Sequence, residues 1–208
     1  MNSILVESAP LIGREVLRHV QPGWKRGPSG TTKTAFFGEN GDVVLCFYDK
    51  DGLHLFRKWV DFCRSHSSPY LPKYRSGWRR GRIGKDSTPV SMIRMEHLTP
   101  MPAHLSKLMT EIDEVQYDLN QDRKLRFASD FNHLIQMVAA KTTSRLALSR
   151  LQIAVTRIEG AFPGFLDVYL DIAKACPAGA RIDSLTGHDG ARNVMMRGDT
   201  PVIIDPWF

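Results

Sequence analysis

The 208-residue sequence is poor in cysteine. Cys46, Cys63 and Cys176 are its only three, and they lie far apart along the chain. This spacing excludes a local metal-ligand motif and a disulfide framework, and it indicates reduced, mostly buried thiols in a cytosolic protein. The sequence also lacks an apolar run near the roughly 20 residues that span a membrane, and its first residues do not follow the secretory-signal pattern. We therefore expect a cytoplasmic protein with no membrane contact.

Hydrophobic residues make up 42% of the chain, which is enough to build a core. The length fits one domain, or two small lobes that share a cleft. The formal net charge of +6 permits binding to nucleic acid, to phosphate groups or to an acidic protein surface, and does not choose among them.

The order of sequence patterns predicts an α+β fold in three parts. Residues 1–22 have apolar side chains near helical spacing and form a leading helix or arm. Residues 23–98 favour a small β-rich lobe, with strands at 33–37, 43–48 and 90–95 and one helix at 53–63. The first two strands are joined by Asn40-Gly41, a strong hairpin pair. The basic, glycine-rich stretch 77–85 is expected to be a loop.

Residues 99–208 are predicted to form a mostly helical lobe that ends in a hairpin. Apolar residues recur at helical spacing in four segments, 105–115, 129–141, 144–158 and 165–176.

The C-terminal stretch carries the residues with the most chemistry. Val194-Met195-Met196 and Val202-Ile203-Ile204 are predicted strands, with a turn at Gly198-Asp199. A hairpin of this length places Asn193 and Asp205 at the same end of the ribbon. An amide oxygen and a carboxylate that converge there suit Mg²⁺ bound to nucleotide phosphates.

This arrangement resembles the catalytic and metal-binding segment of protein kinases. In that pattern an Asp base precedes a metal-binding Asn, and a hairpin leads to a metal-binding Asp. The matching residues here are Asp189, Asn193 and Asp205. The runs Asn193-Val-Met and Val-Ile-Ile-Asp205-Pro look most like the small early protein kinases of autographivirus-type phages, which are podoviruses. The resemblance implies a minimal two-lobed kinase-like fold.

The same resemblance implies ATP and Mg²⁺ as cofactors, with the metal on Asn193 and Asp205. It gives the role of base to Asp189 or, because the usual spacing to the Asn falls one residue earlier, to His188. A two-glycine loop can bring backbone N–H groups close to phosphate oxygens, and the segment after the third predicted strand corresponds to the adenine-binding hinge. The residues expected to contact the nucleotide are Gly27, Gly30, Lys33 and Glu96.

The sequence departs from the kinase pattern in its first lobe. Leu45 or Cys46 stands where the phosphate-pairing lysine is expected, and the predicted helix at 53–63 contains Asp61 but no glutamate. Lys33 or Lys50 would have to replace the lysine. The sequence ends three residues after Asp205, so the resemblance implies a form without an activation segment.

Three classes of function remain open at this stage. The first is a Ser/Thr protein kinase that acts on host bacterial proteins in the host cytoplasm. The second is a pseudokinase that binds and inhibits a host protein, such as RNA polymerase or a defence complex. The third is a nucleic-acid binder with an unrelated fold, for which Arg79, Arg80 and Arg82 beside Trp78 are the candidate contacts.

Overall fold

The computed structural model describes residues 25–29, 33–38, 41–48, 50–83, 88–141, 144–186 and 193–208. The chain divides into two compact units. Unit 1 comprises Met1–His66 and Pro72–His97, and unit 2 comprises Ser67–Leu71 and Leu98–Phe208. The α+β class predicted from the sequence is confirmed. The helix predicted over residues 1–22 lies outside the described residues.

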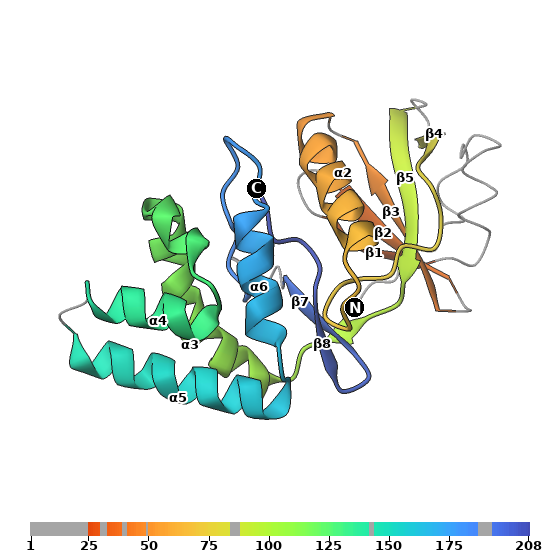
Figure 1. The fold of residues 1–208 in the computed structure, drawn as a ribbon. Coiled ribbons are helices and arrows are strands. Elements are labelled where there is room, and N and C mark those ends of the chain that lie inside the picture. The colour runs from red at the N-terminus through yellow and green to blue at the C-terminus, as the bar shows by residue number, and fades with distance from the viewer. Residues whose placement is uncertain are drawn as a thin grey trace. The chain divides into compact units, whose positions relative to one another are not determined.

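Unit 1 is built on a five-stranded antiparallel sheet with the order β1-β2-β3-β5-β4. Its strands are β1 (Lys25–Ser29), β2 (Lys33–Phe37), β3 (Asp42–Phe47), β4 (Arg79–Ile83) and β5 (Thr88–Glu96). Helix α2 (Lys50–Ser65) follows β3, and Figure 1 shows it lying along one face of the sheet.

The sequence of β2 and β3 explains why they pair. Buried and half-buried residues alternate along β2, whereas β3, the central strand of the sheet, is buried over almost its whole length. On the face that α2 covers, the rings of Phe47 and Phe56 have centroids 4.7 Å apart. The other face carries a buried apolar cluster of Phe36, Val44, Cys46, Val90 and Met92.

Two strands of this sheet were not predicted. The sequence predicts a loop at 77–85, but residues 79–83 form the edge strand β4. The strand forms because its backbone pairs with β5, and the charged side chains of 79–83 give no sign of this pairing. Strand β1 covers part of the glycine loop and is irregular between Arg26 and Ser29, around Gly27-Pro28.

Unit 2 contains most of the helices. They are α3 (Ala103–Gln121), the 3₁₀ helix η2 (Arg123–Phe127), α4 (Phe131–Ala139), α5 (Arg145–Ala161) and α6 (Phe165–Lys174). Helix α3 packs against α5 and buries a stripe at helical spacing: Leu105, Met109, Ile112, Val115 and Leu119. The helix predicted over 105–115 is thus confirmed and is longer at both ends.

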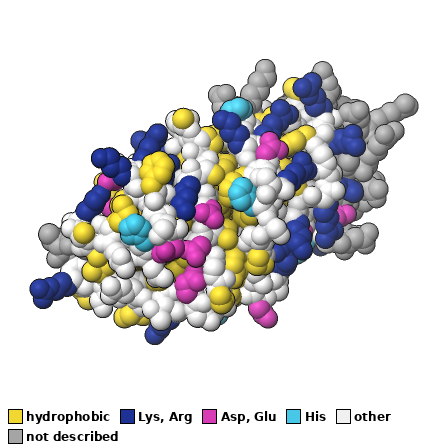
Figure 2. Space-filling view, viewed as in Figure 1, with side chains coloured by type: hydrophobic (Ala, Val, Ile, Leu, Met, Phe, Trp, Pro, Cys, Tyr) yellow, Lys and Arg dark blue, Asp and Glu magenta, His cyan; other side chains and the backbone are white. Residues whose placement is uncertain are grey.

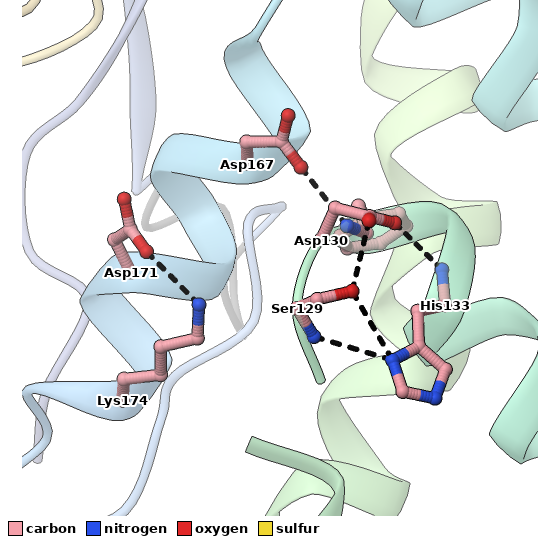
Figure 3. A network of polar contacts seen from close by, with 7 residues as sticks. Ser129, Asp130, His133, Asp167, Asp171 and Lys174 are labelled. Atoms are coloured by element: carbon pink, nitrogen blue, oxygen red, sulfur yellow. Dashed lines mark hydrogen bonds and ion pairs between the residues drawn. The ribbon is translucent and has the colours of Figure 1, made fainter. Parts of the chain in front are cut away.

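The start of α4 is fixed by a network of capping contacts (Figure 3). The Asp130 carboxylate accepts the His133 N–H at 2.8 Å and the Ser129 hydroxyl at 2.9 Å. Asp167 of α6 accepts the Phe131 N–H at 2.9 Å. The contacts from His133 and Ser129 hold the pKa of the Asp130 carboxyl below its ordinary value. Asp130 and Asp167 therefore cap the N-terminus of α4.

A three-stranded sheet completes unit 2, with β7 between β6 and β8. Its strands are β6 (Thr99–Pro100), β7 (Val194–Arg197) and β8 (Thr200–Ile203). Within the described part of the chain, no helix combines the length and the apolar character that crossing a membrane requires.

Candidate functional site

The hairpin of β7 and β8 places Asn193 and Asp205 at one end of the ribbon. Val194 pairs with Ile203, so Asn193 enters the hairpin beside the point where the chain leaves it. The Ile204 N–H donates to the Asn193 carbonyl oxygen at 2.8 Å, which extends the pairing by one step toward Asp205. The turn at the other end has Gly198 at φ 58°, a backbone conformation that favours glycine. The predicted hairpin is confirmed.

The Asn193 side chain has a fixed orientation. The residue is buried, and its Nδ2 donates to the Ser184 carbonyl oxygen at 2.8 Å. No residue in the described ranges is seen to donate to its Oδ1. Since only the oxygen of an amide coordinates Mg²⁺, this orientation turns the useful atom of Asn193 away from Ser184 and suits a metal ligand.

The segment that contains Asp205 is also held in place. The Asp183 N–H donates to the Pro206 carbonyl oxygen at 2.7 Å, and Arg181 and Phe208 exchange two backbone hydrogen bonds. The buried Trp207 donates through Nε1 to the Ile172 carbonyl oxygen at 3.2 Å. Asp205 itself is half-buried. Its backbone is therefore anchored from both sides.

Helix α3 fixes the segment that precedes residues 187–192. Gln116 and Asn120 donate to the Ile182 carbonyl oxygen at 2.6 and 2.9 Å. Asp113 accepts the Leu185 N–H at 2.5 Å and the Thr186 N–H at 3.2 Å. We call Asp113, Gln116 and Asn120 the α3 clamp.

Burial raises the pKa of the Asp113 carboxyl, and the nearby Asp183 adds to this rise. Hydrogen bonds from Thr186 and Leu185 oppose it without cancelling it. The hydroxyl of Tyr169, which is fully buried, has no hydrogen-bond partner among the described residues. Asp113 and Asp183 add to the effect of burial in raising the pKa of Tyr169.

The clamp was not foreseen from the sequence. Its three residues are spaced i, i+3 and i+7 on α3, which places them on one face of the helix. A polar stripe beside the apolar stripe of α3 is the sequence signal that could have indicated these contacts.

Of the residues expected to contact nucleotide, Gly27, Lys33 and Glu96 belong to unit 1. A Cβ atom on Gly27 would lie 2.1 Å from Cε2 of Phe37, so any larger residue there would have to displace this half-buried ring. Lys33 Nζ lies 4.7 Å from the centroid of the Phe56 ring, on the face of the sheet that α2 covers.

Glu96, a residue of the predicted hinge, is buried and makes hydrogen bonds within unit 1. Its Oε1 accepts the Lys73 N–H at 2.7 Å, and its own N–H donates to the Lys73 carbonyl oxygen at 3.0 Å. A ligand that needs a backbone donor at this position would have to displace Lys73 or use a neighbouring residue.

The positions that lack the kinase lysine are core positions. Leu45 and Cys46 are both buried, and burial raises the pKa of the Cys46 thiol to about 12. Helix α2 contains no glutamate at any position. Unit 1 therefore does not contain the lysine–glutamate pair at the expected places.

Several predicted residues lie outside the described part of the chain, namely Gly30, His188 and Asp189, and so does the side chain of Arg82. Arg79 and Arg80 are exposed on β4, at the edge of the sheet. Within the described ranges, no three His, Cys, Asp or Glu side chains are grouped as metal ligands. Among the described residues, Asn193 and Asp205 are the ones that the resemblance assigns to a metal at the hairpin.

No known protein family matched this sequence when its family model was compared with the chain, and no curated protein matched it either.

Proposed function

We propose that this chain is a kinase-like protein of bacteriophage type that binds ATP with Mg²⁺ and transfers a phosphoryl group to Ser or Thr hydroxyls of host bacterial proteins. The observation that carries the proposal is the hairpin, which brings Asn193 and Asp205 to one end and fixes the Asn193 amide with its nitrogen on Ser184. A minimal two-lobed kinase-like fold is part of the same proposal. The order of strands, helix α2 and further strands in unit 1 supports it.

In this proposal each residue has a limited task. Asn193 and Asp205 hold the metal, which supplies charge neutralisation on the phosphates when it is bound. Asp189, or His188 beside it, accepts or orients the proton of the attacking hydroxyl. Phosphoryl transfer needs mainly positioning and charge stabilisation, so this small set of groups is chemically sufficient.

A thermal-shift measurement with ATP and Mg²⁺ tests the proposal. Ligand at one hundred times its dissociation constant stabilises a folded protein by about 2.7 kcal/mol, which raises the melting temperature by several degrees at this size. Asp205→Ala should abolish the shift. Asp199→Ala is the matched control, because Asp199 is an exposed acid at the opposite end of the same hairpin. An intact protein that is not stabilised by ATP with Mg²⁺ would contradict the proposal.

The buried Leu45 and Cys46 favour a second candidate, a pseudokinase that keeps the nucleotide site and inhibits a host protein by binding it. Incorporation of labelled phosphate from ATP separates the two candidates. The kinase proposal expects autophosphorylation or transfer to a host extract that is lost in both Asp189→Ala and Asp205→Ala. A thermal shift without any phosphate incorporation would select the pseudokinase.

A further inference from the structure

Unit 1 contains a groove that is cationic at its rim and apolar at its floor. It has a volume of about 610 Å³ and lies between the end of β3, the start of α2, and strands β4 and β5. Leu53 and Pro89 supply its accessible apolar surface, and Phe47 and Val90 line it as buried residues. His54, Arg57 and Arg80 are the basic residues of its lining, and no Asp or Glu lines it within the described residues. A volume of this size is typical of ligand-binding clefts.

Arg57 is the residue that points to an anionic occupant. Its Cζ lies 5.3 Å from the centroid of the Trp78 ring, so the guanidinium group stacks on the indole. Its Nε is buried and has no hydrogen-bond acceptor among the described residues. The Arg57 guanidinium is thus a fixed cation in the lining of the groove, and it can pair with a carboxylate bound there.

The excess of basic residues lies in unit 1, the unit that contains the groove. Unit 1 contains 16 Lys and Arg against nine Asp and Glu, whereas unit 2 contains 12 against 13. The net positive charge of the protein therefore comes from unit 1. Figure 2 shows Lys and Arg side chains gathered over the region of α2, β4 and β5, with hydrophobic side chains visible between them.

We propose that the groove binds a peptide segment of a partner protein in which carboxylates flank an aromatic or aliphatic side chain. The apolar side chain would cover the floor, and the carboxylates would pair with Arg57 and Arg80. Strand β4 lies at the edge of the sheet, beside the groove, and can add backbone hydrogen bonds to an extended peptide.

Nucleic acid fits the same groove less well. Unspecific binding of single strands uses open aromatic faces on which bases stack. Phe47 is only 2% exposed, and Trp78 already carries the Arg57 guanidinium on its ring.

Fluorescence anisotropy with a labelled hexapeptide, Asp-Glu-Phe-Asp-Phe-Glu, tests the proposal in the absence of ATP. Arg79 and Arg80 offer a matched pair, because they are adjacent and exposed on β4 but only Arg80 lines the groove. Arg80→Glu and Arg79→Glu change the net charge equally. We expect Arg80→Glu to weaken binding about tenfold or more, and Arg79→Glu to change it less than about threefold.

Two further measurements complete the experiment. Arg57→Met keeps an apolar stem against Trp78 but removes the charge, and it should weaken peptide binding without altering the binding of a labelled ten-nucleotide DNA strand. Replacing both Phe residues of the peptide by Ser should also weaken binding. Absence of peptide binding, equal effects of Arg79→Glu and Arg80→Glu, or tighter binding of the DNA than of the peptide would overturn the proposal.

Discussion

At Gly27, the absence of a side chain lets the Phe37 ring pack directly against the backbone of β1. The sequence pattern, in which two glycines bracket Pro28-Ser29, predicts a phosphate-binding loop at this position. If Gly27 contacts phosphate, a substitution should weaken ATP binding. If Gly27 only makes room for the Phe37 ring, a substitution should lower stability.

We predict that Gly27→Ala lowers the free energy of unfolding by about 1–3 kcal/mol, because the new methyl group overlaps the Phe37 ring. The double variant Gly27→Ala with Phe37→Leu should recover part of that loss. Urea unfolding measures both values, with Phe37→Leu alone as the control. If Gly27→Ala were as stable as the wild type but bound ATP more weakly, the packing explanation would be wrong.

Individual site residues were only partly predictable from the sequence. Asn193 and Asp205 could be placed together because a hairpin of short, apolar strands fixes which residues share an end. The burial of Glu96 and its two hydrogen bonds to Lys73 could not be predicted, because they join positions 23 residues apart through a tertiary contact.

At the scale of elements, helix α3 acts as a support for the backbone of residues 182–186. The Asp113 carboxylate is the centre of this support, since it accepts from two backbone N–H groups and from the Thr186 hydroxyl at 2.5 Å. Thr186, the last residue that Asp113 contacts, directly precedes residues 187–192, which include His188 and Asp189.

We predict that Asp113→Asn lowers the free energy of unfolding by about 1–3 kcal/mol at neutral pH. The reason is that an amide has one accepting oxygen where the carboxylate has two, so a donor from Leu185 or Thr186 loses its acceptor. Glu114→Gln is the control, since Glu114 is the next residue on α3 and is exposed. Chemical denaturation followed by circular dichroism measures both. Equal stabilities for the two variants would contradict a clamping role for Asp113.

The raised pKa of Asp113 also gives a pH dependence with a definite sign. The folded state binds the proton more tightly than the unfolded state, so the contribution of Asp113 to stability is greatest below the ordinary value of 3.8. This stabilising contribution falls as the pH rises from 3.8 through the raised pKa of the folded state, and above that pKa it no longer changes with pH. The stability difference between wild type and Asp113→Asn should therefore shrink over this range, whereas an increase would contradict the assignment.

The elements themselves were predictable to different degrees. Strands β2, β7 and β8 have alternating or apolar sequences that specify them locally, and they lie within a residue or two of their predicted bounds. Strand β4 has the sequence Arg-Arg-Gly-Arg-Ile and forms because β5 offers it an antiparallel partner. Local propensity carries no information about that partner.

At the scale of the whole molecule, the two units differ in charge and in the function proposed for them. Unit 1 holds the excess of basic residues and the groove proposed to bind an acidic peptide, and unit 2 holds the hairpin with Asn193 and Asp205. The two proposals can fail independently, because peptide binding is measured without nucleotide and nucleotide binding without peptide.

Calorimetric titration of the intact protein with a non-hydrolysable ATP analogue, once with Mg²⁺ and once with Mg²⁺ removed by EDTA, tests the nucleotide site at the hairpin. We predict that binding depends on the metal, and that Asn193→Ala and Asp205→Ala each weaken it about tenfold or more, whereas Asp199→Ala does not. Binding that is unchanged by EDTA and by both substitutions would contradict a metal-dependent nucleotide site at the hairpin.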